Sequence, residues 1–180
     1  MNAKDEMFNY LTEPDNYELA NDLTNRLIEV NQRLRFNFLN DLKVKIKNKF
    51  VENQKWKIDD CNNNDNILLD ISKSNWKDYW LTVGIEKTID YGLRIDPAKV
   101  DIKTIDCCRN KFSNLDFGKD STEYWPFWES INIINFELNE YKDLLRILPK
   151  NIKNLQDDIA DKILIFAQKY EEFFDEIVKK

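Results

Sequence analysis

Apolar side chains recur every three or four positions along the N-terminal part of the chain. This apolar stripe consists of Leu19, Leu23, Leu27, Val30, Leu34, Phe38, Leu42, Ile46 and Phe50. Such steps place all of its members on one face of an α-helix. Asp15, followed three residues later by Glu18, has the pattern of a capping box. We predict one long amphipathic helix over about residues 16–50, packed on a domain core, with a coiled coil as the alternative.

The period changes from helical to alternating in the middle of the chain. Alternation or a short apolar run marks Lys55–Ile58, Ile67–Ile71, Tyr79–Glu86 and Tyr91–Asp96. These segments predict strands of an antiparallel meander, with a turn at residues 87–90. Gly84 and Gly92 lie inside predicted strands, which indicates close approach by a large ring or by another backbone.

Helical spacing returns towards the C-terminus. Leu138–Leu148 predicts a short helix that ends near Pro149, and Ile152–Ile177 predicts a long final helix. No repeat or linker divides the chain. We therefore predict a single α+β domain over residues 1–180 with a flexible N-terminus at residues 1–15. Its architecture is an antiparallel β-meander of about four strands packed against long N-terminal and C-terminal amphipathic helices.

The charge balance bears on the kind of partner. The chain has 27 Lys and Arg residues against 33 Asp and Glu residues, a net charge of −6. An acidic chain is a poor general ligand for phosphate backbones, so we expect a protein partner and no direct nucleic-acid contact. Eight basic and two acidic residues lie between Arg33 and Lys57. We interpret this run as a solvated helix face.

The inventory of reactive side chains argues against catalysis. The chain has no histidine, which excludes Ser–His and Cys–His nucleophile systems. Cys61, Cys107 and Cys108 do not have the spacing of a zinc site or of a disulfide scaffold. We predict no enzymatic activity, no cofactor and no metal. The N-terminus lacks an apolar signal-peptide core and no stretch approaches the roughly 20 apolar residues of a membrane span, so we expect a cytoplasmic protein without membrane contact.

One carboxylate pattern leaves an enzymatic alternative open. Asp101-Ile102-Lys103, with Asp90 or Asp96 upstream, has the local form of a metal-dependent nuclease core. In such a core the carboxylates hold Mg²⁺ and the lysine positions water. A surface strand with ordinary charges is the competing interpretation.

The five tryptophans supply the candidate binding residues. Trp125 and Trp128 flank Pro126-Phe127, and we expect them to line an exposed groove. The other candidates for partner or ligand binding are Trp80, Tyr91, Glu86 and Arg94. Among them, Glu86 follows an apolar strand and is expected to pair with Arg94. For most of the tryptophans, however, core packing is the expected role.

The order of these motifs resembles the C-terminal accessory module of bacterial PD-(D/E)XK nuclease-family proteins linked to phage defence. In that family a Tyr-Gly-Ile strand and a Trp-Trp-Pro-Trp motif precede a terminal helix. The matching residues here are Gly84, Ile85, Glu86, Tyr91, Gly92, Trp125, Pro126, Phe127 and Trp128. The resemblance covers about Tyr17 to Val178, but the upstream nuclease domain of the family has no counterpart in this sequence. It implies an accessory or sensing module without catalytic residues.

These expectations combine into a functional hypothesis. The chain is expected to be a non-enzymatic protein-interaction module in bacterial defence or phage counter-defence, such as an acidic inhibitor of a nucleic-acid-processing effector. Its partner would be a defence effector or its regulator, and its long helices also offer a route to a homodimer. A small-ligand or nucleotide sensor and a minimal metal-dependent nuclease are the alternatives.

Overall fold

The computed structural model describes residues 3–52, 55–59, 67–85, 87–112, 114–117, 122–131, 146–148 and 152–178. The chain divides into two compact units, Met1–Asn37 and Phe38–Lys180. The boundary between them falls inside helix α2, which spans Pro14–Val51. Each unit is described by itself below, and the expectation of a single domain stays a prediction.

The first unit is helical throughout its described part. Helix α1 spans Ala3–Thr12, within the segment that we expected to be flexible. Helix α2 then starts at Pro14, and the amide of Tyr17 donates to the carbonyl of Glu13 at 2.9 Å. Proline costs no hydrogen bond at the first helical position, since that amide has no partner within the helix. The predicted long helix is therefore confirmed, with a start slightly earlier than the expected cap at Asp15.

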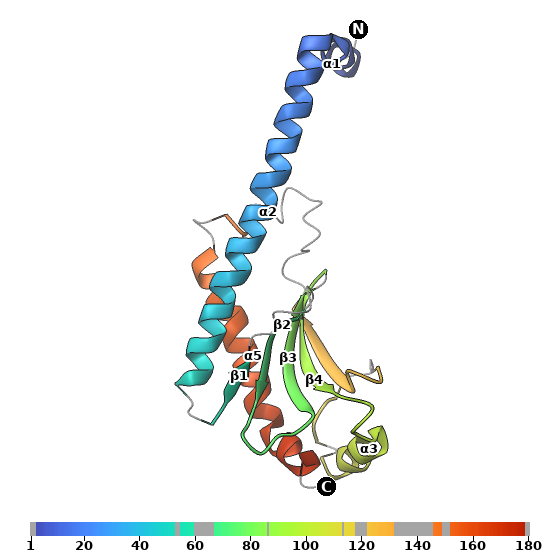
Figure 1. Cartoon of the computed structure of the whole chain (residues 1–180), viewed down its shortest axis with the longest axis vertical. Coiled ribbons are helices and arrows are strands. Elements are labelled where there is room, and N and C mark those ends of the chain that lie inside the picture. The colour runs from blue at the N-terminus through green and yellow to red at the C-terminus, as the bar shows by residue number, and fades with distance from the viewer. Residues whose placement is uncertain are drawn as a thin grey trace. The chain divides into compact units, whose positions relative to one another are not determined.

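The second unit is built on one five-stranded antiparallel sheet (Figure 1). Its strands follow the order of the sequence: β1 Lys57–Asp59, β2 Ile67–Ser72, β3 Tyr79–Ile85, β4 Ile89–Ile95 and β5 Phe127–Ile131. Four of them were predicted. The fifth, β5, begins inside the aromatic cluster that contains Trp125 and Trp128. The structure confirms the α+β class and the meander, with one strand more than expected.

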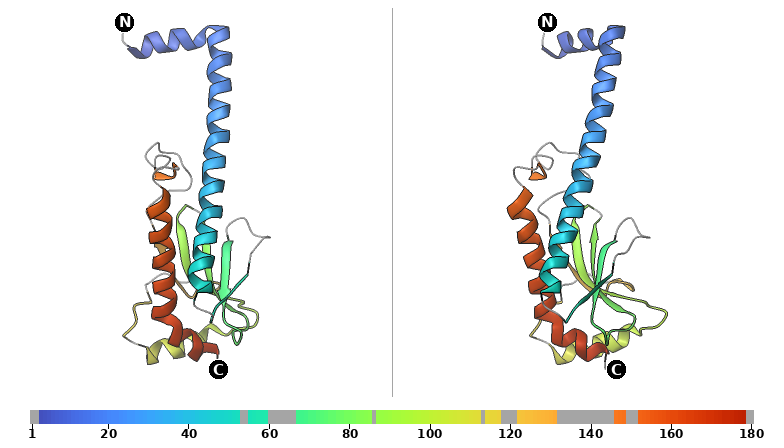
Figure 2. Two further views of the ribbon diagram at one scale, coloured as in Figure 1. Left: turned by 90° about the vertical axis from the view of Figure 1, so that its left-hand side faces the viewer. Right: turned by 60° about the vertical axis from the view of Figure 1, so that its left-hand side comes forward.

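Two helices lie side by side against one face of this sheet (Figure 2). They are the second-unit part of α2 and the long final helix α5, which spans Ile152–Val178 as predicted. The stripe residues Phe38, Leu42, Ile46 and Phe50 are completely buried there. The Gln156 side chain, also buried, donates to the carbonyl of Phe38 at 2.9 Å.

Ion pairs between these helices account for much of the basic run in α2. Lys45 lies 2.6 Å from Asp157, and Lys49 lies 2.5 Å from Asp161. These pairs are partly exposed, so water and salt screen them and they contribute little to stability. They neutralise lysines that the sequence suggested would form a solvated basic face.

Aromatic rings fill the space between the sheet and α5. Phe127 of β5 lies at the centre, with its ring centroid 5.0 Å from that of Tyr170 and 5.8 Å from that of Phe174. Phe166, Phe173 and Phe117 also contact it. Aromatic pairs at these separations add about 0.5–1.5 kcal/mol each beyond their buried area. This cluster therefore fixes β5 to the final helix.

A further helix, α3, spans Ile102–Lys111 in the segment that connects β4 to β5. Within it Cys107 is exposed and Cys108 is buried. The short helix predicted over Leu138–Leu148 falls mostly on residues outside the described part of the chain, and so does Cys61.

The close approach predicted at Gly92 is confirmed. A Cβ atom at this position would lie 2.5 Å from the Cα and 2.6 Å from the Cβ of Trp128, and it would also overlap the carbonyl oxygen of Phe127. Real Cβ atoms do not occur at such distances, so only glycine lets β5 pair this closely with β4.

We therefore expect Gly92→Ala to force β4 and β5 apart. Overpacking of this kind lowers the free energy of unfolding by about 1–3 kcal/mol. Urea denaturation followed by tryptophan fluorescence measures the change. An unfolding midpoint equal to that of the unsubstituted protein would contradict the close approach of β5.

Candidate functional site

The face of the sheet opposite the helices carries three of the predicted binding residues. Because strand side chains alternate between faces, Trp80, Arg94 and Trp128 point away from the buried core positions Leu81 and Leu93. Trp80 pairs directly with Arg94 across β3 and β4, and Trp128 pairs with Gly92. With Asp70 and Thr82, these three side chains form what we call the polar sheet face.

A buried hydrogen-bond network lies at the centre of the polar sheet face. The Thr82 hydroxyl donates to Asp70 and accepts from Arg94 Nε at 3.0 Å. Arg94 Nη2 completes an ion pair with Asp70. Asp70 is only 5% exposed and Thr82 is fully buried. The guanidinium of Arg94 also lies over the Trp80 ring, 4.6 Å from its centroid, in cation–π geometry.

This network gives Arg94 a partner that the sequence did not predict. Arg94 pairs with Asp70, and the expected pairing with Glu86 stays a prediction because Glu86 lies outside the described residues. The sequence did indicate that Asp70 needs a partner. Asp70 lies inside the apolar run Ile67–Ile71, and a carboxylate in such a run needs a cationic partner when the run is buried. Two of the five N–H donors of Arg94 are used in its bonds to Thr82 and Asp70.

The two tryptophans of the aromatic cluster have different surroundings. Trp128 lies half-buried on the polar sheet face. Trp125 precedes β5 and is also half-buried, and its amide donates to the Thr122 hydroxyl at 3.0 Å. Between them Phe127 points into the core. Trp125 and Trp128 were predicted binding residues, whereas Phe127, which contacts the rings of Phe117, Phe166, Tyr170, Phe173 and Phe174, was not singled out.

Tyr91 lies on the opposite, helix-covered face and so is separated from Trp80 and Arg94. Its hydroxyl donates to Glu129 at 3.0 Å, and its ring lies 5.0 Å from that of Phe166. Burial, and secondarily the Glu129 carboxylate, raises the pKa of Tyr91 well above its ordinary value. Beside this pair is a surface hollow of about 430 Å³, whose lining includes Lys162 and Lys169.

Two further tryptophans are core residues, the role expected for most of them. Trp56 and Trp76 are at most 8% exposed and meet edge to face, 5.5 Å apart. Lys73 lies beside both rings and is 2.7 Å from Glu171 and from Asp175 of α5. Burial alone would lower the pKa of Lys73, but the hydrogen bonds to the two carboxylates outweigh burial and raise the pKa. This cation therefore ties the end of β2 to α5.

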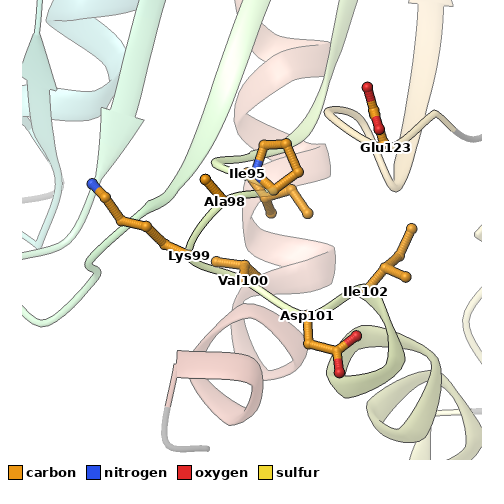
Figure 3. Close-up of a pocket in the computed structure, with 8 residues that line it drawn as sticks. Ile95, Ala98, Lys99, Val100, Asp101, Ile102 and Glu123 are labelled. Atoms are coloured by element: carbon orange, nitrogen blue, oxygen red, sulfur yellow. The ribbon is translucent and has the colours of Figure 1, made fainter.

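The nuclease-like pattern does not have the geometry that its chemistry requires. Asp101 does not lie in a strand. Its carboxylate caps α3 by accepting from the amide of Lys103 at 2.9 Å. It borders a surface hollow of about 510 Å³ (Figure 3), where Glu123 enters from the segment before β5 and Lys99 extends away from it. Lys99 pairs with Asp78 at 2.8 Å. Within the described residues, no three Cys, Asp or Glu side chains are placed to hold a metal ion.

The apolar stripe of α2 is covered in one half and exposed in the other. Leu23 is 58% exposed, Leu27 54% and Val30 51%, whereas the stripe residues from Phe38 onward are buried. Ala20 and Leu34 are half-buried. We call Ala20, Leu23, Leu27, Val30 and Leu34 the helical stripe.

Comparison with known proteins finds no relative of this chain. No family model matches the chain, and no curated protein or solved structure does either. Among the described helices, none combines the length and the apolar character needed to cross a membrane.

The Asp70–Arg94 pair yields a quantitative prediction. Arg94→Met leaves the buried Asp70 carboxylate without its cation, and we expect a loss of about 3 kcal/mol in the free energy of unfolding. The double variant Asp70→Leu/Arg94→Met removes both charges and should recover much of that loss. Chemical denaturation of Arg94→Met, Asp70→Leu, the double variant and the unsubstituted protein gives the coupling energy. Additive effects of the two substitutions would contradict a direct pair.

Proposed function

We propose that the chain is a non-catalytic protein-interaction module that binds another polypeptide chain through the helical stripe. The observation that carries this proposal is the split of one apolar stripe, with exposed leucines over residues 20–34 and buried residues from Phe38 onward. Contiguous exposed apolar side chains on a folded protein mark interaction surfaces. An amphipathic helix that presents them at spacings of three and four is a recurring mode of recognition.

The stability of the helix itself also supports a partner. Helices in water are stabilised mainly by packing of their apolar face, and an isolated segment of this kind is marginal. Residues 14–37 bury little of their apolar face against the described part of the chain. Besides the helical stripe, Leu19 and Tyr17 are also more than 60% exposed. Binding a second chain would supply the missing packing.

The biological setting is part of the proposal and rests on the resemblance to phage-defence accessory modules. In that setting the partner is a defence effector, its regulator or another copy of the module. The polar sheet face is a second candidate surface, because Trp and Arg side chains held rigidly are enriched at the energetic centres of interfaces.

Co-purification with a matched pair of variants tests this function. Leu27→Glu places a charge in the helical stripe, and Asn25→Glu places the same charge on the other side of the same helix turn. We expect the tagged unsubstituted chain and Asn25→Glu to retain a polypeptide at fixed stoichiometry from host cells that also express an untagged copy. Leu27→Glu should lose it. Equal retention by all three chains, or none by any, would contradict the proposal.

A further inference from the structure

Two cross-strand pairs of an aspartate and a hydroxyl residue lie on the outer face of the sheet, opposite the helices. In the first pair, Asp70 of β2 is directly opposite Thr82 of β3, and the Thr82 hydroxyl donates to Asp70 Oδ1. In the second pair, Asp90 of β4 is directly opposite Ser130 of β5, and the Ser130 hydroxyl donates to Asp90 Oδ1 at 2.5 Å. The same arrangement is therefore repeated two strands further along the meander.

The repeat includes a tryptophan. Trp80 precedes Thr82 by two residues, and Trp128 precedes Ser130 by two residues. Side chains two residues apart in a strand point to the same face, so each indole lies on the same face as its own aspartate–hydroxyl pair. Trp128 is also a diagonal neighbour of Asp90 across β4 and β5, a separation that an aromatic side chain can span.

The first set is completed by an arginine from the next strand. Arg94 of β4 lies directly opposite Trp80 of β3, on the side of β3 that faces away from β2. Its guanidinium stacks on the Trp80 ring and forms the ion pair with Asp70 Oδ2. One carboxylate oxygen of Asp70 thus binds the hydroxyl group and the other binds the arginine.

The second set has no arginine in the described part of the chain. Two hydroxyl groups donate to Asp90, those of Ser130 and Thr88, and both bond to Oδ1. No described residue donates to Asp90 Oδ2, and no described cation lies over the Trp128 ring. Asp90 and Trp128 are both half-buried. A partly desolvated carboxylate is stabilised by a cationic partner, which this set lacks.

The position that corresponds to Arg94 lies beyond the edge of the sheet. Strand β5 is the last of the described strands in the sheet order, so a residue opposite Trp128 on the free side of β5 would belong to an added strand. A strand at the edge of a sheet presents backbone N–H and C=O groups that can pair with another chain. Addition of an extended peptide to such an edge is a recurring mode of recognition.

A surface hollow lies beside this edge on the other face of the sheet. It is the hollow of about 430 Å³ between β5 and α5, whose lining includes Ile131 and Ile165. Ile165 is 61% exposed. Because side chains alternate along a strand, the neighbours of an outward-pointing arginine on an added strand would point towards this hollow. Apolar neighbours would cover Ile165 there.

We infer that the free edge of β5 binds an extended segment of a partner polypeptide, antiparallel to β5, with an arginine opposite Trp128. The guanidinium of this arginine stacks on Trp128 and donates to Asp90 Oδ2, as Arg94 does in the first set. Arginine suits both contacts, because its planar fork pairs with carboxylates and stacks on aromatic rings. This edge is separate from the helical stripe, so the inference goes beyond the proposed function.

Selection from a library of random nine-residue peptides, displayed on phage, tests the site on the full-length chain. Each round removes the peptides that bind Asp90→Asn, so that only peptides that depend on this carboxylate survive. We expect the survivors to carry an arginine with apolar residues next to it. Loss of all peptides, or survivors without arginine, would overturn the inference.

The affinity of one surviving peptide, made synthetically, gives the size of the effect. Asp90→Asn keeps the Oδ1 acceptor and removes the charge, and we expect it to raise the dissociation constant by about 10- to 100-fold. Asp59→Asn makes the same change on β1, at the opposite edge of the sheet, and should leave the dissociation constant unchanged. Equal weakening by both variants would overturn the inference. Circular dichroism confirms that each variant is folded.

N-methylated peptides separate strand addition from capture of the arginine side chain alone. Alternate amides of an added strand point towards β5, so methylation of that set should abolish binding and methylation of the other set should not. Equal effects of the two sets would overturn strand addition. Leu27→Glu, which tests the proposed function, should leave the peptide affinity unchanged, so that the failure of either proposal is seen separately.

Discussion

Helix α2 carries one apolar stripe over nearly its whole length, and the chain itself covers only the part that begins at Phe38. From that residue to Phe50 the stripe forms the base of the core, against which α5 and the sheet pack. The hydrophobic effect acts on the rest of the stripe equally, so its exposed leucines favour any state that removes them from water. The proposed interaction follows from this unequal coverage.

The two faces of the sheet have different roles: the inner face packs into the core, and the outer face is a polar surface. Its inner face contributes Phe127 and Tyr91 to the aromatic cluster with α5. Its outer face holds Asp70, Thr82 and Arg94 in one network beneath Trp80. The buried members of that network, Asp70 and Thr82, bond to one another and to Arg94, which favours a rigid surface.

The fold followed from the sequence where periodicity was unambiguous. The 3.6-residue period of the two long helices and the alternation of β3 and β4 were sufficient to place those elements. Strand β5 was missed because Glu129 interrupts its apolar inward positions. An edge strand tolerates this charge, since Glu129 is exposed and accepts a hydrogen bond from Tyr91. Likewise, Asp101-Ile102-Lys103 could not be assigned to a strand or a helix cap from its local pattern alone.

The candidate surfaces were less accessible to sequence reasoning, because they depend on which residues the fold covers. Periodicity showed that Leu23 and Phe38 share a helix face, but only the structure shows that one is exposed and the other buried. Local pattern suggested Glu86 as a partner of Arg94 and gave no sign of Asp70 as its partner. The meander brings Asp70 to Arg94 from two strands away, through the pairing of β2 with β3 and of β3 with β4.

Amide hydrogen exchange along α2 in dilute solution tests the central claim most directly. The account predicts slow exchange for residues 38–51, because their protection comes from the chain's own core. For residues 20–34 it predicts fast exchange. Equal protection of both segments would show that the chain covers the whole stripe by itself and would contradict the account.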